Sequence, residues 1–141
     1  MTKIEKRLKP IVDYVQRETG YLIKIKTCKD NGYLLKGTAV VNEEKRNVAY
    51  IYAANLTQGI HEMGHLLSTP GPWPESGISM LLRELVAWRT SECLHHKFNI
   101  PFDEECFDEG LGSYITELVA SDERPSLAWL SQLIGEQTLL R

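Results

Sequence analysis

The feature that most constrains this chain is a five-residue pattern near its middle, His61-Glu62-Met63-Gly64-His65. Two histidines four residues apart lie on one face of an α-helix, one turn from each other. Both imidazoles can then reach one zinc ion at roughly 2.0–2.1 Å. Glu62 follows the first histidine directly, so it points to the side where a general base is needed. The motif predicts a helix that carries part of a metal site and requires a third ligand from elsewhere.

The residues before the motif predict one helix and three strands. Apolar residues recur at helical spacing over residues 2–19, and Gly20 can end that helix. Three segments with strand-like composition are separated by turn signals: Tyr21–Cys28, Tyr33–Asn42 and Val48–Ala53. The Asn31-Gly32 pair favours a tight hairpin between the first two segments. We therefore expect a meander, which makes the sheet mainly antiparallel.

The motif itself lies in a well-marked helix. Asn55, with Gln58 three residues later, forms a capping box that predicts a helix from Leu56 to about Ser68. Gly59 and Gly64 are unusual inside a helix, where each costs about 1 kcal/mol relative to Ala. A close-packed neighbour or room for a substrate can explain them.

The residues after the motif predict further helices. Residues 69–77 are rich in Pro and Gly and cannot continue the helix, so the chain reverses there. Helices are then predicted over Ile78–Phe98, Cys106–Leu118 and Leu127–Leu140. The fold class expected is α+β, with residues 1–141 forming a single domain.

A catalytic zinc site takes three protein ligands, so a third must follow His65. The candidates are Glu75, Glu84, Glu92, His95 and His96. The reversal after Ser68 brings the start of the next helix, and Glu84 with it, back beside the histidine pair. Glu92 lies about 12 Å and His95 about 16 Å further along that helix. Glu84 is the favoured ligand, and Glu75, in the Pro-rich loop, stays an alternative.

With these residues in place, the chain resembles the zincin metallopeptidases. The histidine pair with a helical Glu84 is similar to the gluzincin branch; Ser68 and Gly71 stand where metzincins have Gly and His. Within residues 46–92 the chain resembles the small ImmA/IrrE-like proteins of bacteria and phages. That group has Glu-x-x-Ala-Asn where this chain ends the pattern with Trp88.

The resemblance implies a small zincin-like domain that hydrolyses peptide bonds with Zn²⁺. His61, His65 and Glu84 would hold the metal, and Glu62 would act as the general base. The strand over residues 47–53 would pair with an extended protein substrate. A restricted protein partner, and an origin in a phage or mobile element, are implied by the resemblance alone.

Two points about this chemistry stay open in the sequence. The donor to the tetrahedral oxyanion has four candidates: Tyr50, Tyr52, Tyr114 and His95. The alternative function is a catalytically silent zinc-binding module, with a regulatory or phage-interaction role. Glu62 argues against that alternative, because a structural zinc site needs no general base.

Composition indicates the cellular location of the chain and the classes of partner it is expected to bind. No apolar run approaches the roughly 18 residues that span a membrane, and the charged start shows no signal peptide. The cysteines are odd in number and form no C-x-x-C pair, which favours reduced thiols and a cytoplasmic location. Lys and Arg concentrate in the first 50 residues, but they are scattered through helix and strand patterns. We therefore do not expect a nucleic-acid surface.

Overall fold

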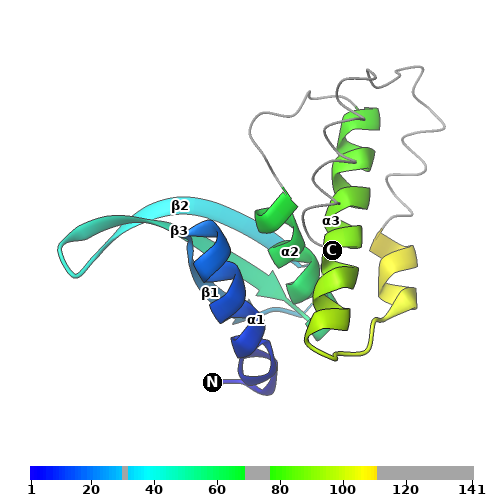
Figure 1. The fold of residues 1–141 in the computed structure, drawn as a ribbon, viewed down its shortest axis with the longest axis horizontal. Helices are drawn as coiled ribbons and strands as arrows, with labels where there is room; N and C mark the ends of the chain where they lie inside the picture. The colour runs from blue at the N-terminus through cyan, green and yellow to red at the C-terminus, as the bar shows by residue number, and fades with distance from the viewer. Residues whose placement is uncertain (30–31, 69–76, 111–141) are drawn as a thin grey trace.

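Three strands form a mixed sheet, and helices pack against one of its faces (Figure 1). The computed structural model describes residues 1–29, 32–68 and 77–110. In chain order the elements are α1 (Lys3–Thr19), β1 (Leu22–Thr27), β2 (Tyr33–Val41), β3 (Glu44–Ala53), α2 (Leu56–Ser68) and α3 (Gly77–Lys97). A short helix follows over residues 104–110. The α+β class expected from the sequence is confirmed.

The helix α1 packs on the sheet through an apolar stripe and has the two ends that the sequence predicts. The Thr2 hydroxyl accepts a hydrogen bond from the Glu5 backbone N–H at 3.2 Å. Gly20 ends the helix in the left-handed region at φ 79°. Pro10 is tolerated inside the helix. Three buried side chains form the stripe: Leu8, Ile11 and Val15.

The core lies between α1, the sheet and α2. Ile23 of β1 lies opposite Ala49 of β3, and Ile51 is two residues further along β3, so all three point to the same face. Helices α1 and α2 cover this face. The buried cluster also takes in four residues of α2 and α3: Ile60, Met63, Leu66 and Leu94.

The predicted meander is wrong in its pairing. The strand order is β1-β3-β2, with β1 parallel to β3 and β2 antiparallel to it. No hairpin therefore joins β1 to β2, and residues 30–31 of the expected turn lie outside the described residues. Alternation of apolar and polar residues fixes which face a side chain takes, but it does not choose the neighbouring strand.

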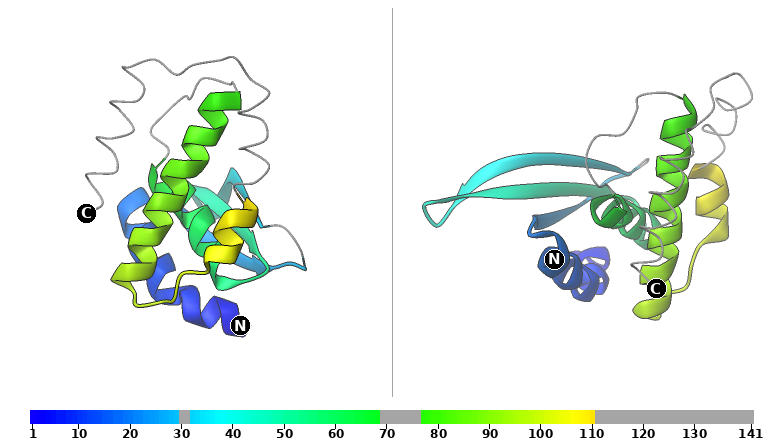
Figure 2. Two further views of the ribbon diagram at one scale, coloured as in Figure 1. Left: turned by 90° about the vertical axis from the view of Figure 1, so that its right-hand side faces the viewer. Right: turned by 45° about the horizontal axis from the view of Figure 1, so that its top comes forward.

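The tight hairpin lies between β2 and β3 instead. Its two turn residues, Asn42 and Glu43, have φ values of 50° and 67°. Positive φ at both positions is typical of the type I′ turn, whose twist matches that of the strands. β3 consequently begins at Glu44, four residues before the predicted start. The hairpin extends away from the helices, which explains how charged residues are accommodated there (Figure 2).

The position of β3 overturns the prediction that residues 47–53 pair with a substrate. β3 is the central strand: residues 48–52 are paired with β1 on one side and with β2 on the other. Their backbone groups are used within the sheet, so no extended peptide can add to them. β2 is at an edge of the sheet, and its first residues line a pocket together with residues of α2 and α3.

The remaining helices agree with the sequence where the structure describes them. α3 was expected over Ile78–Phe98 and is confirmed within a residue at each end. The helix expected over Cys106–Leu118 is described as far as residue 110, and it begins earlier, at residue 104. The helix expected over Leu127–Leu140 lies outside the described residues. Across the described helices, none is long and apolar enough to cross a bilayer.

Candidate metal centre

The candidate metal centre begins with the cap that starts α2 directly after β3. The Asn55 side-chain oxygen accepts a hydrogen bond from the Gln58 backbone N–H at 2.9 Å. The Gln58 side-chain oxygen accepts one from the backbone N–H of Ala54 at 2.8 Å. This reciprocal cap satisfies N–H groups that the helix cannot pair internally. It fixes the start of α2 and thereby which residues face α3.

Gly64 allows α2 and α3 to approach each other closely. A Cβ atom at Gly64 would lie 2.5 Å from the Ala87 carbonyl oxygen and 3.3 Å from the Ser91 backbone nitrogen. Only a residue without a side chain permits that distance. The close-packed neighbour anticipated for this glycine is therefore the backbone of α3. Ala87 is three residues from Glu84, about one helical turn, so the same contact holds Glu84 beside the histidines.

Three ligand atoms converge between α2 and α3. The His61 Nε2 lies 2.8 Å from one carboxylate oxygen of Glu84, and the His65 Nε2 lies 3.0 Å from the other. The two Nε2 atoms are 3.1 Å apart. Tetrahedral zinc with bonds near 2.05 Å places its ligand atoms roughly 3.3 Å from one another. The three side chains therefore fit a zinc ion after shifts of a few tenths of an ångström.

The protonation states also suit a metal. Burial raises the pKa of Glu84, but the hydrogen bonds with His61 and His65 outweigh it and hold that pKa well below its usual range. Burial lowers the pKa of His61, so its imidazole is neutral at pH 7. An ionised carboxylate and a neutral imidazole are the forms that bind zinc. Among the described residues this is the one group of three or more such side chains that could hold a metal.

Glu62 lies in the same pocket as two of the candidate ligands but is not part of their cluster. Glu62 is buried, with only 9% of its surface exposed to solvent. Burial, which outweighs the attraction of His65, raises the pKa of Glu62 to about 7. A carboxyl group with a pKa near 7 can accept and return a proton at neutral pH, which is what a general base must do.

Trp88 holds His61 in place by stacking. The two rings lie 3.9 Å apart between centroids, at an interplanar angle of 24°. Phe102 and Phe107 contact the indole in T-shaped geometry, with ring centroids at 6.2 and 5.3 Å. The His61 Nδ1 atom is buried and has no hydrogen-bond partner among the described residues. Ring stacking thus does the orienting that a hydrogen bond to the second nitrogen usually does in metal sites.

The role of Trp88 was missed in the sequence, although a signal for it was present. Trp88 follows Glu84 by four residues, so a helix places both on one face. The sequence alone favoured only general packing for this tryptophan. Its ring partner lies on a different helix, which spacing along the chain does not reveal.

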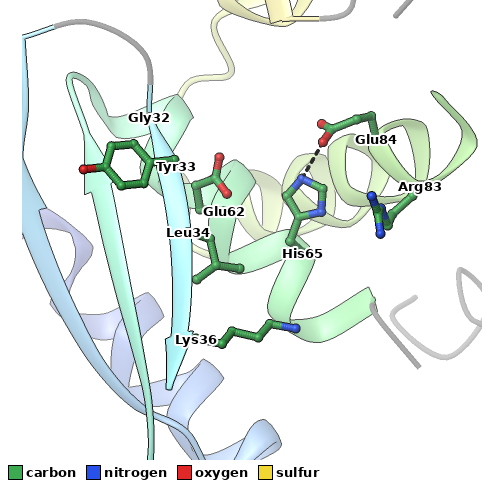
Figure 3. A pocket seen from close by; sticks show the side chains of 8 residues that line it. All are labelled: Gly32, Tyr33, Leu34, Lys36, Glu62, His65, Arg83 and Glu84. Carbon is green, nitrogen blue, oxygen red and sulfur yellow. Dashed lines mark ion pairs between the residues drawn. The ribbon is translucent and has the colours of Figure 1, made fainter. Parts of the chain in front are cut away.

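A pocket of about 400 Å³ opens beside the candidate ligands (Figure 3). One wall is the start of β2, and the other walls come from α2 and α3. Two basic side chains, Lys36 and Arg83, also line it. In Figure 3 their charged ends flank the His65 side of the pocket. Neither basic residue was singled out in the sequence.

The other ligand candidates lie elsewhere or outside the described residues. Glu92 lies 3.7 Å from Arg89 in an exposed ion pair. His95 is buried, donates from Nδ1 to the Ile100 carbonyl at 3.1 Å, and lines a separate pocket with Glu92 and His96. Glu75 belongs to residues 69–76, which the structure does not describe.

The three oxyanion candidates that the structure describes do not line the pocket at this site. Tyr50 and Tyr52 alternate with the buried residues of β3, so they point to the sheet face away from α2. Tyr52 stacks on Tyr33 with ring centroids 4.3 Å apart. His95 is in the separate pocket, and Tyr114 lies outside the described residues.

Comparison with protein-family models, with curated proteins and with solved structures gave no match. The functional conclusion therefore depends on the geometry and chemistry of the residues in this site.

Proposed function

We propose that this protein is a zinc-dependent peptide hydrolase. The observation that carries the proposal is that two distinct kinds of group lie at one site. Three ligand atoms, from His61, His65 and Glu84, converge on one point, and a separate buried carboxyl group, Glu62, lies beside them. A purely structural zinc site has no use for the second kind of group.

The residues divide the reaction between them. A zinc ion bound at the three ligands would polarise the scissile carbonyl and make water a better nucleophile. Glu62 would accept the proton of the attacking water and pass it to the leaving amine. Trp88 would keep the His61 ring aimed at the metal. The raised pKa of Glu62 keeps this proton available for return near neutral pH.

The edge of β2 is the better candidate for holding an extended substrate. β2 is an edge strand among the described strands, and residues 32–36 border the pocket through four of their members. A peptide laid along this edge would gain backbone hydrogen bonds as an added strand. Its backbone would then run past Glu62 and the metal ligands. We propose this strand in place of residues 47–53.

The nature of the partner follows from the resemblance to ImmA/IrrE-like proteins. On that basis the substrate is one protein partner in the cytoplasm, and the gene belongs to a phage or mobile element. The pocket contributes a compatible feature: it is bordered by a strand edge, which binds peptide backbone, rather than by a deep enclosed cavity.

Glu62→Gln tests the proposal, because it keeps the size and polarity of the side chain and removes its basicity. We expect zinc content to be unchanged by elemental analysis and cleavage of a peptide library to be abolished. A Glu84→Ala variant should lose zinc as well as cleavage. Cleavage by Glu62→Gln at the wild-type rate would refute the proposed hydrolase mechanism with Glu62 as its general base. Zinc binding with no cleavage by the wild-type protein would favour the silent binding module.

A further inference from the structure

Two basic side chains line the pocket beside the candidate metal centre. Lys36 comes from the edge strand β2 and Arg83 from α3, directly before the ligand Glu84. Both line the pocket that contains Glu62, His65 and Glu84 (Figure 3). Two elements far apart in the sequence thus bring like charges to one place.

These two cations have no acidic partner in the part of the chain that the structure describes. By contrast, Arg89, less than two turns after Arg83 on the same helix, pairs with Glu92 at 3.7 Å. Lys36 lies 6.0 Å from the centre of the Tyr21 ring, a long cation–π distance. Glu84, the nearest acid in sequence to Arg83, directs its oxygens to the two histidines.

The arrangement has an electrostatic cost. Partial burial, with the neighbouring Arg83 adding to it, lowers the pKa of Lys36. A bound zinc ion would add positive charge to the same pocket. Like charges that are held together without compensation destabilise a fold, so such clusters mark sites that bind an opposite charge. An anion bound in the pocket would offset these charges.

We propose that Lys36 and Arg83 form a subsite for an acidic side chain of the peptide substrate. The inference rests on the proposed binding of a peptide along β2. Leu34 lines the pocket together with Glu62, and Lys36 is two residues beyond it on β2, about 7 Å at the usual rise. We therefore expect an Asp or Glu side chain about two residues from the cleaved bond to lie near Lys36 and Arg83. Arg83 can bind its carboxylate in a bidentate manner, and Lys36 adds a second charge.

A peptide-capture experiment tests this subsite without depending on turnover. Zinc-loaded Glu62→Gln protein is immobilised and incubated with a random library of blocked decapeptides, and bound peptides are sequenced by mass spectrometry. We expect Asp and Glu to be enriched at one position. Matched synthetic peptides with Glu or Gln at that position should differ roughly tenfold in affinity, the effect of a hydrogen bond to a charged group. The difference should shrink as salt is added.

Matched variants connect the preference to the two cations. In the Glu62→Gln background, Lys36→Met with Arg83→Met should abolish the enrichment, while the zinc content stays the same. Lys45→Met with Arg89→Met removes two cations outside the pocket and should leave the enrichment intact. Lys36→Glu with Arg83→Glu should select Lys and Arg instead.

Three results would overturn the subsite. The first is a captured pool with no acidic preference, including a pool in which nothing binds. The second is a preference that persists after Lys36→Met with Arg83→Met. The third is an equal loss of affinity for the Glu and Gln peptides in that variant. That result would mean that the two cations bind the peptide backbone or the oxyanion and not an acidic side chain. Failure of the proposed hydrolysis looks different: the wild type then cleaves nothing, while acidic peptides are still captured.

Discussion

Gly64→Ala should weaken zinc binding much more than it destabilises the fold. The added Cβ atom would lie 2.5 Å from the Ala87 carbonyl oxygen, whereas ordinary contact begins at 3.4 Å. Because a carbonyl of α3 cannot rotate away, the two helices must move apart by most of the 0.9 Å difference. Glu84 moves with α3 and the histidines stay with α2. Zinc ligand distances tolerate about 0.2 Å, so a displacement of this size removes good coordination by all three ligands.

The effect on stability should be smaller, because two contributions oppose each other. Overpacking at a helix contact costs about 1–3 kcal/mol. Replacing Gly by Ala inside a helix returns about 1 kcal/mol. The net loss, about 0–2 kcal/mol, leaves a typical domain folded. We expect zinc affinity, by contrast, to fall by about 100-fold, the upper end for changes that misplace ligands.

A competition titration with a zinc chelator measures the affinity, and urea unfolding of the metal-free protein measures the stability. Gly59→Ala is the matched control on the same helix. Its Cβ atom would lie 2.7 Å from Leu8 Cδ1, the end of a flexible side chain on α1. This contact is not with α3, so it should not displace Glu84. Because the end of the Leu8 side chain can shift and Ala gains about 1 kcal/mol in a helix, Gly59→Ala should cost no more stability than Gly64→Ala and should leave zinc affinity nearly unchanged. If Gly64→Ala binds zinc as tightly as the wild type, close helix approach is not what positions Glu84.

Three further predictions concern the same site. Glu62→Gln should stabilise the metal-free protein at pH 8 by up to about 3 kcal/mol, because the raised pKa of Glu62 makes its ionisation unfavourable in the folded state. The gain should shrink as the pH falls from 7 and vanish below pH 4.5, and a pH-independent gain would contradict this reasoning. Glu84 has a lowered pKa, so its ionised form contributes stability above pH 4.5 that is progressively lost as the pH falls below this value. The urea midpoints of metal-free wild type and Glu84→Gln should therefore converge as the pH falls below 4.5. Parallel plots of urea midpoint against pH would argue against the paired carboxylate. Trp88→Leu should weaken zinc binding about tenfold by freeing the His61 ring, whereas Trp88→Phe should retain most of the affinity. If the two variants bind zinc with equal affinity, stacking does not orient His61.

The helices of this protein could be predicted well, because their signals are local. The cap at Asn55 and the left-handed Gly20 act within a few residues of themselves, and the structure shows both. The spacing of His61 and His65 acts within one turn. The start of α3, and with it the place of Glu84, followed from the Pro- and Gly-rich reversal and an antiparallel return.

The strands were predicted as segments but not as a sheet. Strand pairing joins residues that are far apart, such as Ile23 and Ala49, and no local signal states it. The strong turn signal at Asn31-Gly32 favoured a hairpin between β1 and β2, while β3 took the place between them. That error carried over to the substrate, since residues 47–53 became a central strand and the sheet edge became β2.

The sequence by itself determined the chemistry that this protein can offer: a histidine pair at helical spacing, a carboxylate next to it and a further acid after a reversal. It also determined the helix that presents them, because caps and periodicity are properties of neighbouring residues. The tertiary structure alone decided what surrounds that chemistry. The approach of α3 at Gly64, the stacking of Trp88 on His61 and the lining of one pocket by both Lys36 and Arg83 join separate elements, and they arise only when separate apolar faces share one core.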